Sequence, residues 1–179
     1  ALRSREDLFD IYVQPIPWGE TGWIWEDNEF RQWLDTRITQ TQILLQQQQL
    51  NPDISLQITI PNEFEKITPV NIGYTAGIET TACSAEWLQK VNTVVDQVIV
   101  VSSFSKTAFL NSEYSGNNNG VPVSLRLEKP ISHVNYPVKE HNELPDLGVK
   151  LDYEFNFLAM AQWGPRKNLE NTIGWFVQH

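Results

Sequence analysis

The segment DQVIVVSS (96–103) holds a continuous run of apolar, mostly β-branched residues and ends in two serines. A strand that is apolar at consecutive positions buries both of its faces, as happens in parallel sheets that carry helices on each side. The residues that follow, FSKTAFLNS, predict a helix with Ser102 or Ser103 as its N-terminal cap. A buried strand followed by a helix is the repeating unit of an α/β fold.

Three further segments predict strands: ISLQITI (54–60), VNIGYTAG (70–77) and ISHVNYPV (131–138). Before the buried strand, SAEWLQKVN predicts a helix capped by Ser84. A longer amphipathic helix is predicted upstream, with an apolar stripe from Phe30 to Leu45. This alternation predicts right-handed βαβ units in a parallel, Rossmann-like sheet. The Gly- and Asn-rich segment EYSGNNNGVPV is predicted to be a loop.

The charged, Pro- and Gly-containing residues 139–153 predict a linker between two domains. The Rossmann-like first domain would then span 1–138, and 154–179 would open a second domain. In that second part, FNFLAMAQ predicts a strand and NLENTIGWFVQ a helix. Two elements cannot bury a core of their own, so we expect the first βα unit of an incomplete second domain, or a tail that docks on the first.

The bulk composition excludes several classes of protein. The net charge of -9 argues against a nucleic-acid partner, because few cations remain to track phosphates. The single cysteine, Cys83, cannot form an internal disulfide and is expected to be a small packed residue. No Cys/His cluster has metal-ligand spacing, and no apolar run is long enough for a transmembrane segment, so we expect a cytoplasmic protein without a bound metal.

The motif GPRKN places Arg166 and Lys167 in a strand-to-helix loop, with Asn168 as the expected N-cap of the following helix. Two cations beside unpaired N–H groups and the positive end of a helix dipole form an anion site that would suit a diphosphate. The loop follows a predicted strand, where ligands of open α/β sheets gather. The alternative is that adjacent cations in a surface loop are simply solvated.

A second candidate is the loop within IGYTAGIETTACSAEW (72–87). It carries residues that could approach or bind a sugar: Gly73, Gly77, Glu79, Thr80 and Thr81. A surface turn that merely carries polar side chains is an equally good interpretation, because the sequence contains no glycine-rich nucleotide-binding motif. The three histidines offer no arrangement typical of a hydrolase, and spacing alone identifies no catalytic group.

At this point the residues resemble a known family. The segment FNFLAMAQWGPRKNLENTIGWF resembles the signature that opens the second domain of GT-B glycosyltransferases of the retaining, glycogen-synthase-like group. Upstream, VNIGYTAGIETTACSAEWLQKVNTVVDQVIVVSSFSKTAF is similar to their first domain. The resemblance covers roughly residues 51–179, and its segments occur in the expected order.

The resemblance implies transfer of a sugar from a nucleotide-sugar donor to an acceptor glycan, lipid or protein, without a metal or a separate cofactor. Lys167 matches the lysine that holds the donor diphosphate, with Arg166 and Asn168 as its motif neighbours. The first domain would hold the acceptor, which assigns Gly77, Glu79 and Thr80 to an acceptor-side loop.

This sequence departs from the family's pattern in three places. Residues 161–163 read Ala-Gln-Trp where the family often has an arginine, so one phosphate contact is in doubt. The chain opens on what looks like a later unit of the first domain, and the acidic motif for the donor sugar would lie beyond His179. We therefore expect a fragment of a longer enzyme that is inactive alone.

Two other functions stay open. A non-catalytic carbohydrate-binding or assembly module could use the Trp-rich loop 18–25 as a stacking face, with Lys167 merely solvated. A GT-B type nucleotide-sugar epimerase would bind the same donor without an acceptor.

Overall fold

The computed structural model describes residues 2–16, 27–76, 80–118, 121–138, 146 and 148–178. The chain divides into two compact units, Ala1–Pro137 and Val138–His179. Each unit is described by itself below.

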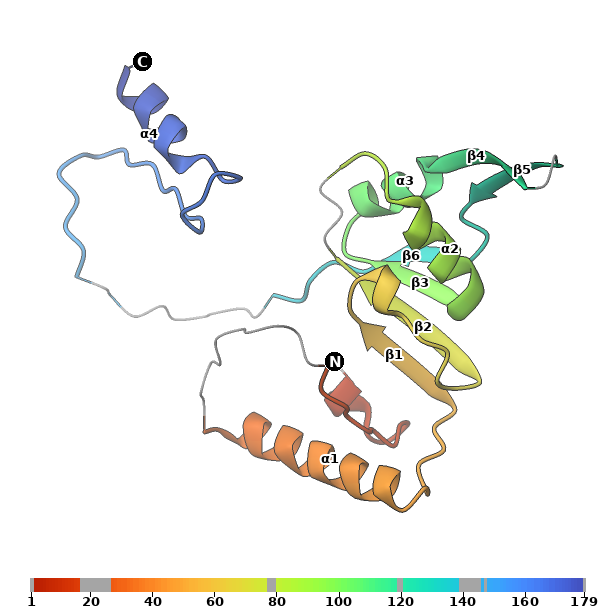
Figure 1. Ribbon diagram of the computed structural model, residues 1–179. Helices are drawn as coiled ribbons and strands as arrows, with labels where there is room; N and C mark the ends of the chain where they lie inside the picture. Colours follow the sequence, from red (N-terminus) through yellow and green to blue (C-terminus); the bar gives the residue numbers. More distant parts are fainter. Residues whose placement is uncertain are drawn as a thin grey trace. The chain divides into compact units, whose positions relative to one another are not determined.

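The first unit is built on a four-stranded parallel sheet with strand order β1-β2-β3-β6 (Figure 1). Its strands are β1 (Ile54–Ile58), β2 (Val70–Thr75), β3 (Gln97–Val100) and β6 (Ile131–His133). The predicted parallel α/β sheet is confirmed. Strand β6 is shorter than the predicted strand 131–138, although beyond His133 the N–H of Val134 still donates to the carbonyl of Val100 in β3 at 2.8 Å.

Two helices pack against one face of this sheet. Helix α2 (Ala85–Val94) begins after Ser84, whose hydroxyl accepts the N–H of Trp87 at 3.3 Å. Helix α3 (Ser103–Asn111) begins after Ser102, whose hydroxyl accepts the N–H of Ser105 at 3.1 Å. Each cap satisfies a backbone donor that the first turn of a helix leaves unpaired. Of the two predicted caps for α3, the structure therefore selects Ser102.

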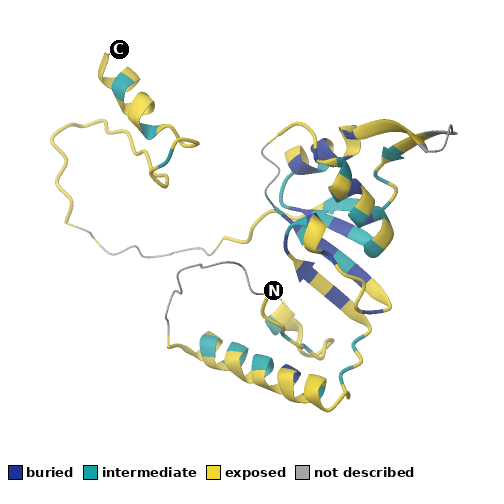
Figure 2. Cartoon of the chain, viewed as in Figure 1, coloured by how far each residue is buried: buried dark blue, intermediate teal, exposed yellow. Residues whose placement is uncertain are grey.

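The core of the first unit lies between this face and the two helices (Figure 2). Its fully buried apolar side chains are Phe64, Leu88, Val91, Val95, Val98, Val100, Ala108 and Phe109. Cys83 joins them at 5% exposure, as predicted for a small packed residue.

The connection between β1 and β2 contains no α-helix. Residues 59–69 form a loop with one 3-10 turn, η2 (Pro61–Glu63), and side chains of the flanking strands hold it. Asn71, fully buried, accepts hydrogen bonds at Oδ1 from the N–H groups of Ile67 and Thr68 at 3.0 and 3.1 Å. Gln57 pairs through both ends of its amide with the backbone of Glu65, at 2.6 and 2.8 Å. These bonds replace the helix that a parallel crossover usually carries.

The prediction of a loop at EYSGNNNGVPV was wrong. The segment forms an antiparallel hairpin of β4 (Glu113–Asn118) and β5 (Val121–Arg126). Asn-Gly between two runs of extended residues is a hairpin signal, and here it outweighed the low strand propensity of Gly116 and Asn117.

The predicted amphipathic helix is confirmed as α1 (Glu29–Gln46), capped by the side chain of Asn28. The N-terminal segment, which includes the 3-10 turn η1 (Leu2–Arg5), lies along it. Glu6 accepts hydrogen bonds from the indole of Trp33 at 2.9 Å and from Arg37 at 2.6 Å. The N–H of Val13 donates to the hydroxyl of the buried Thr41 at 2.9 Å.

The second unit contains one regular element within its described residues, helix α4 (Leu169–Gln178). The predicted strand FNFLAMAQ is wrong, since residues 155–162 form no ladder. Its aromatic residues contact one another: the ring centroid of Phe157 lies 5.0 Å from that of Phe155 and 4.7 Å from that of Phe176. An isolated strand has no partner for its backbone groups and does not persist alone.

Candidate functional site

The carboxyl ends of the parallel strands place several polar groups at one edge of the sheet. Strands β2, β3 and β6 end there at Thr75, Val100 and His133, and helices α2 and α3 begin just beyond β2 and β3. Ligands of open α/β sheets bind at this edge. His133 is exposed on the outermost strand, and Thr75 is buried.

Only part of the predicted acceptor-side loop falls within the described residues. Gly77 and Glu79 lie outside them, whereas Thr80 is exposed and donates its hydroxyl proton to the carbonyl of Ala82 at 2.6 Å. The hydroxyl oxygen of Thr80 keeps its lone pairs for accepting a bond from a ligand.

Gly73 does not serve the close approach of a ligand that its place in the sequence suggested. A Cβ atom at this position would lie 2.4 Å from a ring carbon of Phe64. Because Phe64 is fully buried, the absence of a side chain at Gly73 makes room for a core residue.

The start of α3 is a part of this edge that sequence reasoning missed as a site. Ser102 and Ser105 lie with their hydroxyl oxygens 3.0 Å apart, and the half-buried Lys106 follows in the first turn. A cation beside the amino end of a helix favours an anion. The signal was present in SSFSK, where serine caps precede a lysine.

Cys83 lies near the same edge but is not arranged for chemistry. Its sulfur lies 3.4 Å from the hydroxyl oxygen of Ser112, and its carbonyl accepts a hydrogen bond from Tyr114. Burial raises the pKa of the Cys83 thiol, and Ser112 offsets this in part. A nucleophilic cysteine requires a lowered pKa and access to solvent, so Cys83 is a packing residue.

The predicted cation pair lies in a tight turn of the second unit. The carbonyl of Gly164 accepts the N–H groups of Lys167 and Asn168 at 3.1 and 3.2 Å. Both Arg166 and Lys167 are exposed immediately before α4. Both side chains are therefore accessible to an anion from solution.

Asn168 directly precedes α4, as predicted for its N-cap, but its side chain does not make the hydrogen bond to a backbone N–H that a cap usually makes. The carbonyl of Asn168 accepts the N–H of Thr172 at 3.1 Å, which is the first hydrogen bond of α4. Its side-chain oxygen accepts from the amide of Asn171 at 2.8 Å, and its φ of 50° lies in the left-handed region. Asparagine tolerates that region better than most residues do, which explains its presence in this turn.

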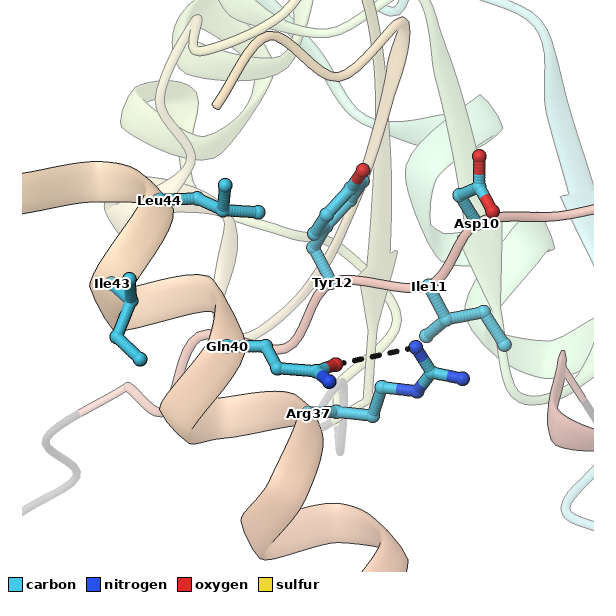
Figure 3. A pocket seen from close by; sticks show the side chains of 7 residues that line it. All are labelled: Asp10, Ile11, Tyr12, Arg37, Gln40, Ile43 and Leu44. Carbon is cyan, nitrogen blue, oxygen red and sulfur yellow. Dashed lines mark hydrogen bonds between the residues drawn. The ribbon is translucent and has the colours of Figure 1, made fainter. Parts of the chain in front are cut away.

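A groove of about 340 Å³ lies between the N-terminal segment and α1 (Figure 3). Its lining residues are Asp10, Ile11, Tyr12, Arg37, Gln40, Ile43 and Leu44. Arg37 is already paired with the carboxylate of Glu6 and contacts the Gln40 amide oxygen at 3.4 Å. Because Glu6 neutralises Arg37 and Asp10 adds a negative charge, this groove does not favour a diphosphate.

No group of three or more His, Cys, Asp or Glu side chains that could hold a metal ion occurs within the described ranges. None of the helices among these residues has both the length and the apolar character of a membrane span. No protein-family model matches the sequence, and no curated protein and no solved structure is significantly similar to it.

Proposed function

We propose that this chain is part of a glycosyltransferase that moves a sugar from a nucleotide-sugar donor to an acceptor. The observation that carries the proposal is the turn Gly164–Lys167, which places two exposed cations at the start of α4. It is supported by the parallel α/β unit upstream and by the resemblance of these segments to retaining GT-B enzymes.

Lys167 would hold the donor diphosphate in this reaction. The bond between the anomeric carbon and the diphosphate oxygen breaks, the acceptor oxygen bonds to that carbon, and a nucleoside diphosphate and a proton are released. Negative charge grows on the diphosphate in the transition state, and a cation placed beside it lowers the barrier. Arg166, its neighbour in the exposed turn, adds a second positive charge.

The acceptor would lie at the carboxyl edge of the parallel sheet, where the exposed hydroxyl of Thr80 can bond to a sugar hydroxyl. Gly77 and Glu79 belong to the same proposed loop. The Trp-rich loop 18–25 of the alternative carbohydrate-binding module lies outside the described residues.

Calorimetric titration of the full enzyme that contains this chain, with a panel of nucleotide sugars and the matching nucleoside diphosphates, tests this proposal. We expect one donor to bind and Lys167→Ala to weaken that binding by about 10-fold or more, as for loss of a charge-assisted bond. Lys150→Ala is the matched control, because it removes an exposed lysine of the same unit that lies outside the turn.

The outcomes separate the candidate functions. No binding of any nucleotide by the well-folded full enzyme would contradict the glycosyltransferase, and binding of free sugars alone would favour the carbohydrate-binding module. If a donor does bind, turnover that needs an acceptor distinguishes a transferase from an epimerase. That measurement belongs to the full enzyme.

A further inference from the structure

One face of the parallel sheet is covered by helices and a loop, whereas the other face is exposed. On the face that α2, α3 and the loop 59–69 cover, β1 and β2 present mostly polar side chains that are buried, including Ser55, Gln57 and Asn71. On the other face they present apolar side chains that remain exposed. The exposed fractions are 52% for Ile54, 42% for Leu56, 63% for Ile58 and 42% for Val70. Figure 2 shows the buried and exposed bands alternating along β1.

The register makes these residues one continuous surface. Ile54 pairs with Val70, Leu56 with Ile72, and Ile58 with Tyr74, so their side chains stand in rows on the same side of the sheet. Ile99 of β3 extends the last row through its pairing with Tyr74, and the polar Gln97 ends the middle row through its pairing with Ile72. We call these seven residues the open face: Ile54, Leu56, Ile58, Val70, Ile72, Tyr74 and Ile99. Parallel sheets are covered on both faces, so an apolar open face needs a partner.

The open face has the size of one helix. Three strands about 4.8 Å apart and about 17 Å long offer a few hundred Å². A stable dimer needs about 800 Å² from each partner, which is more than this face supplies. A single helix is about 10 Å wide and fits across the three strands.

Helix α1 has a free apolar flank of the right kind. The N-terminal segment occupies the side of α1 that carries Trp33, Arg37 and Thr41. The adjacent flank carries four apolar residues, Phe30, Leu34, Ile38 and Leu45, with Thr41 among them and the Arg31–Asp35 ion pair at its edge. Phe30 and Leu45 are 53% and 43% exposed, and Leu34 and Ile38 are half-buried.

We infer that α1 docks its Phe30–Leu45 flank on the open face of the sheet. The link 47–53 between α1 and β1 spans at most about 24 Å. Such a short tether gives α1 a high effective concentration at this face, which favours it over any partner in solution. A link this short requires the C-terminal end of α1 to lie near the start of β1, so the docked helix would run antiparallel to β1, with Leu45 toward Ile54 and Phe30 toward Ile58.

Hydroxyl-radical labelling of the unaltered chain tests the inference. Ile58 and Ile67 have similar exposed fractions, 63% and 57%, but only Ile58 belongs to the open face. Docked α1 predicts severalfold less labelling at Ile58 than at Ile67. Equal labelling of the two side chains would overturn the proposal.

A cysteine pair identifies the occupant. In Ile38→Cys combined with Leu56→Cys, we expect a disulfide within one chain, formed at least about tenfold faster than in the control Thr36→Cys with Leu56→Cys. Thr36 is exposed and, at 3.6 residues per turn, lies on the opposite side of α1 from this flank. Equal rates in the two pairs, or a disulfide that joins two chains, would contradict docking by α1. The single variants Ile38→Cys and Leu56→Cys show whether the buried Cys83 forms a disulfide with either introduced cysteine.

Discussion

The two units contain similar sequence patterns and reach different degrees of structure. In the first unit, β3 and α3 follow one another and bury Val98, Val100 and Phe109 completely. In the second unit, FNFLAMAQ and α4 also follow one another, yet no described residue there is buried. Phe157 is 70% exposed although it contacts two other rings.

The difference lies in the neighbours, since both segments are apolar. Strand β3 pairs with β2 on one side and β6 on the other, which satisfies its backbone groups, and its Val98 and Val100 are buried in the core. Residues 155–162 pair with no strand among the described residues, so their extended pattern has nothing to hold it. A segment with a strand-like sequence forms a strand only when it can pair with a neighbouring strand.

Truncating one phenylalanine in each unit should show the largest contrast. Phe64→Ala removes a fully buried ring and should lower the free energy of unfolding of the first unit by about 3–5 kcal/mol. Phe157→Ala removes an exposed ring of the second unit and should change the free energy of unfolding measured for the chain by less than about 0.5 kcal/mol. Urea denaturation followed by circular dichroism measures both. Similar losses in the two variants would contradict the comparison.

Replacing a buried asparagine of the first unit should likewise cost more stability than replacing an exposed asparagine of the second. Asn71→Leu leaves the N–H groups of Ile67 and Thr68 without their acceptor in a buried site, which should cost about 3 kcal/mol. Asn171→Ala removes an exposed bond to Asn168 and should cost less than about 0.5 kcal/mol. The same denaturation experiment applies. A cost below about 1 kcal/mol for Asn71→Leu would show that the loop 59–69 is held in another way.

The elements that sequence predicted correctly are those whose signals are local. Ser84 and Ser102 cap α2 and α3 through bonds three residues away, and the apolar run at 98–101 predicted a strand. The burial expected on both faces of β3 is found only on the face of Val98 and Val100, because Ile99 is half-buried. The strand predicted at 155–162 failed because pairing depends on residues far away in the sequence. The role of Gly73 could not be predicted either, because Phe64 reaches it only through the fold of the loop 59–69.

In the candidate site too, the features set by local sequence signals were predictable, and those that depend on the folded turn were not. That Arg166 and Lys167 precede a helix was predictable, because Asn168 and the apolar period of α4 are local signals. The left-handed backbone of Asn168 was not, because Gly164 sets it by accepting two N–H bonds in a tight turn.

Adding a methyl group at a glycine should have opposite effects in the two units. Gly73→Ala forces Phe64 out of place and should destabilise the first unit by about 1–3 kcal/mol. Gly174→Ala meets open space inside α4 and should stabilise that helix by up to about 1 kcal/mol. Circular dichroism of the two variants measures the change. Tolerance of Gly73→Ala without loss of stability would mean that Phe64 moves freely.

Lowering the pH should weaken the attachment of the N-terminal segment to α1. Hydrogen bonds from Trp33 and then from Arg37 hold the pKa of Glu6 below its usual value of 4.5. A carboxyl with a lowered pKa in the folded state stabilises that state above the unfolded pKa. The contribution therefore disappears as the pH falls from about 4.5 through the folded pKa.

The indole N–H signal of Trp33 in NMR spectra reports this change. It should titrate below pH 4.5 in the parent chain and stay constant in Glu6→Gln, whose amide cannot ionise. An identical titration in both chains would assign the transition to another group.

Hydrogen exchange of the 179-residue chain, read by mass spectrometry, tests most directly the claim that, among the residues the structure describes, those of the first unit form a core and those of the second do not. We expect slow exchange in β2, β3, α2 and α3, where the buried apolar residues lie, and fast exchange in residues 155–162 and in α4. Slow exchange in residues 155–162, at the level of β3, would contradict that claim.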